Sequence, residues 1–376
     1  MRKIFFIALA CITAALAFYS CTKSSSGGDP GTGPVTGFDK TEMLKNYTDT
    51  IIIPAYSVMQ QRIAALQTAS DAFLNAPAAA TQVTLKTAYE SVYLQYERVA
   101  AFQFGPAETA LLDIFLNFSG GLDYNFNTSG ALTGFSIDSV TIENNISSGA
   151  YDLSSMTRSS FYAQGFPALN YLYFGPNAIS KFGTNTTKRN KYVNDVVARM
   201  KTLVDNVTTG WTAYRTEFIA NKKTNVGSPI GNLVNQFAYQ MDLLKGPRIG
   251  WPFGKQSNGI IFASKCEGYF SGSSLALATE NLTSLKNTYT GNTGRGIDDY
   301  LVYLNKTSLN NDVLAQFDAA ISALRAIPNP LSASFTTNAT SIDAAYKEIQ
   351  KLLTLLKTDV ASATAVQITF MDNDGD

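Results

Sequence analysis

The chain has 376 residues, 45% of them hydrophobic and 15% charged, and 29 Lys and Arg balance 29 Asp and Glu. This neutrality excludes recruitment to nucleic acid or to an anionic membrane by net charge. The sequence contains no histidine, so Ser-His-Asp and Cys-His mechanisms, which use imidazole as the base, are excluded as well.

The N-terminus has the pattern of an export signal. Arg2 and Lys3 precede an apolar run over residues 4–18, which is too short to cross a bilayer comfortably. We therefore expect residues 1–20 to be a signal peptide. Cys21 follows Ser20, as at a bacterial lipoprotein cleavage site, and we expect it to become the acylated N-terminus. The alternative is ordinary signal cleavage with an incidental cysteine.

Residues 21–37 contain mostly Ser, Gly, Pro and Thr, so we expect a flexible tether that begins at the lipidated Cys21. No acidic run follows Cys21, which favours an outer-membrane lipoprotein on the periplasmic face. Cys11 leaves with the signal, and Cys266 is then the one thiol without a lipid. The sequence therefore predicts no intramolecular disulfide, and stability must come from the core.

The first half of the folded body reads as helical. Residues 40–75 predict a helix that Pro54 breaks or kinks, and residues 81–104 predict a second that Gly105-Pro106 ends. Residues 122–146 are rich in Thr, Asn, Gly and Ser, which predicts a long irregular excursion with a short hairpin. A further helix is expected over residues 161–173.

The second half has the clearest amphipathic patterns. Ser228 and Pro229 predict a capped helix start, and residues 245–247 predict its end. Apolar residues at helical spacing predict helices over residues 193–211, 274–289, 311–326 and 342–360. Together these segments predict an all-α protein of two four-helix-bundle-like domains, at residues 38–222 and 228–370, with an acidic tail at residues 371–376.

Residues 165–175, GFPALNYLYFG, form the signature segment. This segment resembles the signature of the imelysin-like family, which has a glycine, then His-x-x-Glu, then an aromatic-apolar run that ends in Phe-Gly. Gly165 and Gly175 match the pattern. Pro167 stands where the family has its histidine and Asn170 where it has its glutamate, so the two residues best suited to hold a metal are replaced.

The resemblance covers most of the body from about residue 38. Its other landmarks are residues 96–98 (YER), 102–106 (FQFGP), 188–192 (KRNKY), 245–254 (KGPRIGWPFG), 266–271 (CEGYFS) and the ending at 368–370 (ITF). It implies two related four-helix bundles with a functional site at their interface. The family was first described as peptidases and is now more often linked with iron uptake.

The residues themselves argue against zinc, because zinc sites in proteins are built from His and Cys together with carboxylates. No cofactor is certain, although carboxylate and phenolate oxygens suit iron or another hard cation. Glu97, Arg248, Trp251 and Glu267 are the candidate ligand-binding residues at the domain interface. The structural alternatives are an ion pair for Glu97, a plain structural role for Glu267 and a loop-closing salt bridge for Arg248. Trp251, beside Pro252 and Gly254, is a candidate for the wall of a pocket.

Residues 372–376 (DNDGD) resemble the start of a calcium loop but lack its later glutamate, so a solvated tail is the simpler interpretation. The leading hypothesis is a lipid-anchored, periplasmic, non-enzymatic accessory or binding component of iron or metal uptake. The alternatives are a carboxylate-based hydrolase or residual peptidase, and a peptide- or sugar-binding envelope lipoprotein. Expected partners are the membrane, through the lipid, and an envelope transport component. We expect a monomer that binds no nucleic acid.

Overall fold

The computed structural model describes residues 37–118, 125–126, 132–133, 138–183, 186–255 and 258–370. Contacts divide the chain into Met1–Phe38 and Asp39–Asp376, and the described helices belong to the second unit. The predicted signal peptide, Cys21, nearly all of the tether and the acidic tail lie outside the described residues. Within the described residues, no helix combines the length and the apolar character that a membrane span requires.

The body begins with one long, nearly continuous helical run. Asp39 caps it by accepting hydrogen bonds from the amides of Thr41 (2.9 Å) and Glu42 (3.1 Å). The run comprises α1 (Lys40–Asn46), the π-helical η1 (Tyr47–Ile52) and α2 (Ile53–Asn75). Pro54 is the second residue of α2 and cannot donate a hydrogen bond back into η1, which precedes it directly. The predicted break at Pro54 is therefore a wide π turn before it, and the chain stays helical.

The return helix is α3 (Ala79–Val99), which continues as the 3₁₀ turn η2 (Ala100–Phe102) and packs along α2. Gly105 has a positive φ of 56° and Pro106 begins the next helix, so the predicted stop at this pair is confirmed. Two short helices follow, α4 (Pro106–Thr109) and α5 (Leu112–Leu116).

The predicted excursion contains a minimal hairpin, because β1 (Asn125–Phe126) pairs antiparallel with β2 (Leu132–Thr133). The irregular segment was expected to extend to residue 146, and this is wrong. From Ser139 the chain is helical because the Asp138 side chain caps the Thr141 amide at 2.9 Å. Four helices then precede the long one: α6 (Ser139–Ser148), α7 (Arg158–Phe161), α8 (Gly165–Phe174) and α9 (Ala178–Gly183).

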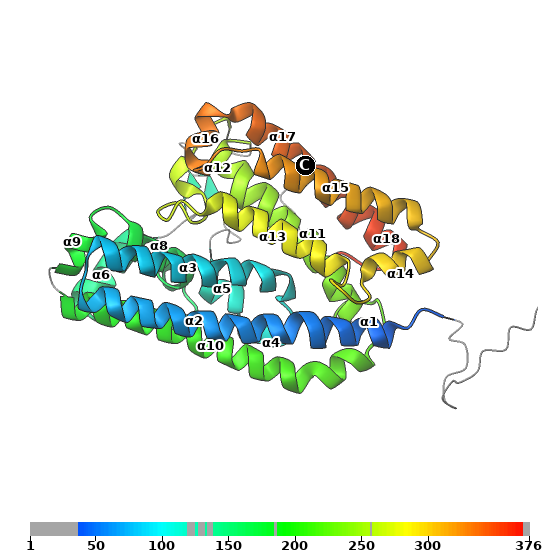
Figure 1. Ribbon diagram of the computed structural model, residues 1–376, viewed down its shortest axis with the longest axis horizontal. Helices are drawn as coiled ribbons and strands as arrows, with labels where there is room; N and C mark the ends of the chain where they lie inside the picture. The colour runs from blue at the N-terminus through cyan, green and yellow to red at the C-terminus, as the bar shows by residue number, and fades with distance from the viewer. Residues whose placement is uncertain are drawn as a thin grey trace, which may run out of the picture. The chain divides into compact units, whose positions relative to one another are not determined.

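The longest helix, α10 (Thr186–Ala220), packs against α2 and α8. Its predicted apolar stripe over residues 193–211 is buried, from Val193 to Trp211. Figure 1 shows α2, α3 and α10 running alongside one another, with α8 at one end of α3. These helices form the first bundle, and the amphipathic pattern of each supplies its core.

The second bundle consists of α11 (Pro229–Leu243), α13 (Ser274–Tyr289), α15 (Thr307–Arg325) and α17 (Ala339–Thr354). Ser228 caps α11 as predicted, accepting from the Gly231 amide at 3.2 Å. The remaining elements are α12 (Trp251–Phe253), η4 (Ala263–Lys265), α14 (Ile297–Tyr303), α16 (Leu331–Thr337), the π-helical η5 (Leu355–Val360) and α18 (Ala361–Ala363). Figure 1 shows this bundle in yellow-green to red.

The expected end of α11 needs a correction. The α-helix does end at Leu243, but the chain continues as the π-helix η3 (Leu244–Gly250) directly into α12. Pro247 cannot donate a hydrogen bond, and its ring would clash with the carbonyl four residues earlier in a regular helix. A wider turn removes both conflicts, so the chain bends within a helix and buries Arg248.

Candidate functional site where the two bundles meet

The signature segment forms helix α8 and the residue after it. Gly165 begins the helix with φ +68°, and a Cβ there would lie 2.2 Å from the Leu116 carbonyl oxygen, so only glycine fits. Pro167 is half-buried at the third residue of α8, where an amide hydrogen would have no partner within the helix. Gly175 follows the helix, and a Cβ there would lie 2.4 Å from the Tyr171 carbonyl oxygen.

Asn170 joins the signature segment to the second bundle. Its side chain is buried; Oδ1 accepts from the Phe270 amide at 2.9 Å and Nδ2 donates to Ser271 Oγ at 2.8 Å. Both polar atoms of the amide therefore bind the segment 266–271, another landmark of the family resemblance. The Asn170 side chain therefore has a structural role.

The metal that the family pattern implies does not fit this segment. Pro167 offers no side-chain ligand atom, and both amide atoms of Asn170 are engaged. Across the ranges that the structure describes, no three His, Cys, Asp or Glu side chains gather in a way that would hold a metal ion. We therefore assign no metal chemistry to residues 165–175.

Three of the four interface candidates come together as the buried cluster of Glu97, Arg248 and Glu267. Arg248 Nη1 lies 2.7 Å from Glu97 Oε2, and Arg248 Nε lies 3.4 Å from Glu267 Oε2. The side chains of Glu97, Glu267 and Arg248 are 0%, 4% and 7% exposed. One guanidinium from η3 thus joins a carboxylate on α3 to a carboxylate beside the signature segment.

Neutral polar side chains complete this cluster, and no sequence motif singles them out. Asn117 Nδ2 and the Tyr93 hydroxyl lie 2.7 Å and 2.9 Å from Glu267 Oε1, and both donate to it. Asn281 Nδ2 donates to Glu97 Oε2 at 2.9 Å and to Gln240 Oε1 at 3.1 Å. The one available hint was Asn281 itself, an amide within the apolar stripe of residues 274–289, which predicts a buried hydrogen bond.

Burial dominates the electrostatics of the cluster. Desolvation raises the pKa of Glu97 to about 8, with the Glu267 charge adding to the effect and Arg248 opposing it. Burial disfavours the charge of Arg248, yet Glu267 and Glu97 raise its pKa above the ordinary value. Glu97 Oε1 accepts no hydrogen bond from the described residues. The cluster is therefore a desolvated network of ionisable and hydrogen-bonding groups with little access for a substrate.

Trp251, the fourth candidate, is the first residue of α12 and is 3% exposed. It does not line the open cavity between α2, α3 and α13. Its expected role as a pocket wall stays a prediction.

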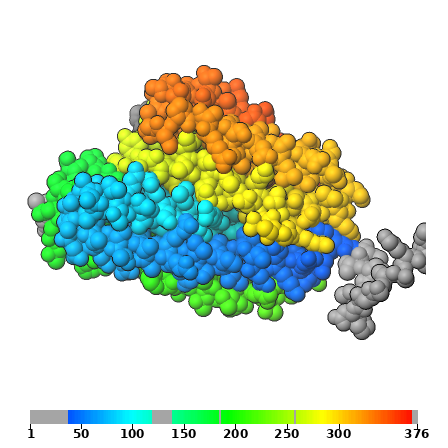
Figure 2. Space-filling view, in the orientation of Figure 1, coloured from blue at the N-terminus to red at the C-terminus, as the bar shows by residue number. Residues whose placement is uncertain are grey.

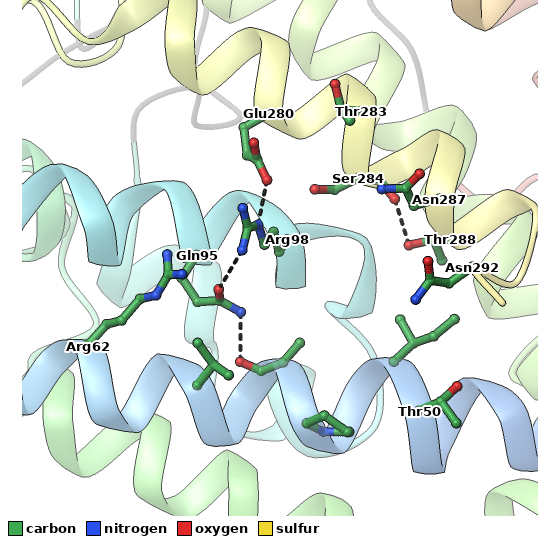
Figure 3. Close-up of a pocket in the computed structure, with 14 residues that line it drawn as sticks. Thr50, Arg62, Gln95, Arg98, Glu280, Thr283, Ser284, Asn287, Thr288 and Asn292 are labelled. Carbon is green, nitrogen blue, oxygen red and sulfur yellow. Dashed lines mark hydrogen bonds and ion pairs between the residues drawn. The ribbon is translucent and has the colours of Figure 1, made fainter.

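An open cavity of about 550 Å³ lies outside the buried cluster, between η1, α2, α3 and α13. On both α3 and α13, two consecutive residues face different sites: one faces the buried cluster and the other faces the cavity. Glu97 and Asn281 bond to each other in the interior, whereas Arg98 and Glu280 line the cavity and pair at 2.5 Å. Figure 2 shows the surfaces of α2, α3 and α13 on one face of the molecule, and Figure 3 shows the side chains that line the cavity. No sequence motif had indicated any of these lining residues.

The arrangement of two helical bundles around a polar contact defines an all-helical protein of the imelysin-like class. A family model described as Imelysin (Peptidase M75) matches residues 52–358, and the chain belongs to this family. No curated protein matches the chain.

Two crystal structures share the fold. One is described as a candidate iron-regulated protein A precursor from Parabacteroides distasonis, with a TM-score of 0.69 and 19% identity over 91% of this chain and 98% of that one. The other is an imelysin-like protein from Psychrobacter arcticum, with a TM-score of 0.68 and 15% identity over 89% of this chain and 98% of that one.

Proposed function

We propose that this chain is a lipid-anchored, non-enzymatic binding component of the cell envelope that serves iron or other metal uptake. The observation that carries the proposal is the signature segment, where Pro167 and Asn170 replace the family's His and Glu and Asn170 is committed to Phe270 and Ser271. A chain that keeps the fold without those groups is suited to binding. The link to iron rests on the family and on the description of the Parabacteroides structure.

The hydrolase alternative requires a pair of accessible carboxylates. Glu97 and Glu267 do meet at Arg248, but their side chains are 0% and 4% exposed and are engaged by Arg248, Asn281, Tyr93 and Asn117. A general acid or base must reach the substrate or a bound water. This burial therefore favours a structural network over a catalytic pair.

The test is the uptake of radiolabelled iron by the source bacterium under iron limitation, with and without this chain. We expect slower uptake in the deletion strain and recovery when the wild-type chain is returned. Returned Glu97→Gln should also restore uptake, because the proposal assigns no catalytic step to that carboxyl. Unchanged uptake in the deletion strain would contradict the proposal, as would peptide hydrolysis by the purified chain that Glu97→Gln abolishes.

A further inference from the structure

The cavity between α2, α3 and α13 carries an excess positive charge. Its charged lining residues are Arg62, Arg98 and Glu280. Arg98 Nε lies 2.5 Å from Glu280 Oε1, so this pair is neutral. Arg62 donates from Nη1 to the Ser91 carbonyl oxygen at 2.8 Å and forms no ion pair with any described residue. Arg62 is therefore a half-buried guanidinium with donors to spare, and no described carboxylate lies within ion-pair distance of it.

The surroundings of Arg62 destabilise its positive charge, and a bound anion would offset this effect. Partial burial, followed by the nearby positive charge of Arg98, lowers the pKa of Arg62, while Glu280 acts in the opposite direction. The guanidinium stays protonated at neutral pH despite this shift. Figure 3 shows Arg62 reaching from α2 toward Gln95 and Arg98 on α3.

Neutral groups make up the rest of the cavity. Ile51, Pro54, Ala55 and Val58 form an apolar wall on η1 and α2. The opposite wall carries hydroxyls and amides from α13 and the turn after it, including Thr283, Ser284, Asn287 and Asn292. The amides of Asn287 and Asn292 are exposed and make no side-chain hydrogen bond to the described residues.

The charge and polarity of the lining residues favour one class of ligand. A carboxylate matches the planar fork of Arg62, hydroxyl groups match the free amides, and a short carbon skeleton matches the apolar wall. A bare metal cation is disfavoured, because the lining offers one carboxylate, Glu280, which Arg98 already holds. Among the described residues that line the cavity, none has an aromatic ring on which a neutral sugar or a base would stack.

We propose that this cavity binds a small hydroxylated carboxylate, with Arg62 as the anchor of the carboxylate group. The inference deepens the proposed function and rests on it for its biological meaning, because hydroxyl and carboxylate oxygens are ligands that hard cations prefer. The protein would then receive the metal as an anionic chelate. A sugar acid presents the same chemistry, so the ligand has two sources that an experiment must separate.

The experiment is calorimetric titration of the mature chain, made with Cys21→Ala to avoid the lipid, with citrate, galacturonate and glucose. We expect binding of citrate or galacturonate and none of glucose. Citrate alone would identify a chelator source, and galacturonate alone a sugar-acid source. Arg62→Gln should weaken binding at least about tenfold, since it removes a charge-assisted hydrogen bond.

Glu280→Gln provides a variant with the opposite expected sign. It removes the one lining carboxylate and releases Arg98, so the anion should bind several-fold more tightly. A gain of affinity cannot result from misfolding. Arg325→Gln, at an exposed site in the last turn of α15, is the matched control and should bind as the wild type does.

The inference is overturned if neither carboxylate binds, if glucose binds equally well, or if Arg62→Gln and Glu280→Gln leave the affinity unchanged. These outcomes are independent of the cellular test. Iron uptake that depends on the chain, together with no anion binding, would leave the proposed function standing and remove this site. Anion binding without an uptake defect would support this site and contradict the proposed function.

Discussion

Gly165 carries the strictest steric requirement in the signature segment. Its φ of +68° strains any other residue, and an added Cβ would lie 2.2 Å from the Leu116 carbonyl oxygen. The left-handed conformation alone costs about 1–2 kcal/mol. We expect Gly165→Ala to lower the free energy of unfolding by more than about 3 kcal/mol, because α8 or α5 must also move. Urea denaturation measures this loss.

Gly227 is the matched control, because it separates backbone strain from crowding. It has φ +77° but open space where a Cβ would stand. Gly227→Ala should therefore cost about 1–2 kcal/mol, the contribution of strain alone. Equal losses of unfolding free energy for the two variants would show that the Leu116 carbonyl moves easily to accommodate the added Cβ.

Glu97 makes stability depend on pH. Its pKa is about 8 in the folded chain, raised first by desolvation, against an ordinary value of 4.5. The folded state therefore holds a proton that the unfolded chain has lost between these values. The stability that this proton contributes is fully present below about pH 4.5 and is lost as the pH rises through about 8.

Glu97→Gln should remove this dependence. We expect the difference in unfolding free energy between wild type and variant to shift against the wild type from pH 5 to pH 8, by up to about 1.4 kcal/mol per pH unit. Urea denaturation at several pH values measures it. Glu217→Gln, at an exposed position on α10, should show no such trend. A constant difference for Glu97→Gln would mean that Arg248 keeps this carboxylate charged throughout.

At the scale of helices, Asn170 fastens α8 to the segment 266–271. Asn170→Ala leaves the Phe270 amide without its acceptor and removes one donor from Ser271 Oγ, which keeps its contact with Ser273 Oγ. We expect a loss of about 1–3 kcal/mol, the usual cost of unsatisfied buried partners. Hydrogen exchange should quicken at the Phe270 amide. Asn144→Ala, on the exposed face of α6, is the control; unchanged exchange at Phe270 in Asn170→Ala would contradict this role.

Helices with a regular apolar stripe could be predicted closely from the sequence. The prediction of residues 274–289 matches α13, and the stripe over residues 193–211 lies inside α10. Periodicity was sufficient there because local pattern and tertiary burial agree. At Pro247 periodicity was insufficient. The chain accommodates the missing N–H with a π-helical turn and does not end the helix there, and a local pattern does not distinguish these two outcomes.

The candidate site was predictable only in part. Glu97, Arg248 and Glu267 were singled out through the family resemblance, and the structure brings them together. Their partners Tyr93, Asn117, Asn281 and Gln240 were missed, because hydrogen bonds between residues distant in the sequence depend on how helices pack. Arg62 and the cavity were missed for the same reason. The two bundles at residues 38–222 and 228–370 stay a prediction as separate domains.

At the scale of the whole molecule, the cysteines decide where the proposed lipid anchor can be attached. Of the three cysteines, Cys266 is buried at 4% exposure, and desolvation raises the pKa of its thiol to about 11, which makes it a poor nucleophile. Cys11 lies inside the predicted signal peptide. Cys21 is therefore the residue that we propose to be acylated.

Lipid attachment can be followed by metabolic labelling with radioactive palmitate and by fractionation of the cells. We expect the wild-type chain to carry label and to sediment with the outer membrane, because each buried methylene of an acyl chain contributes about 0.8 kcal/mol to membrane binding. Cys21→Ala should lose the label and leave the membrane fraction, whereas Cys11→Ala and Cys266→Ala should keep both. Protease added to intact cells should spare a chain on the periplasmic face. Palmitate label retained by Cys21→Ala would contradict acylation at this cysteine. Digestion in intact cells would place the folded body on the outer surface, where it would bind its ligand outside the cell.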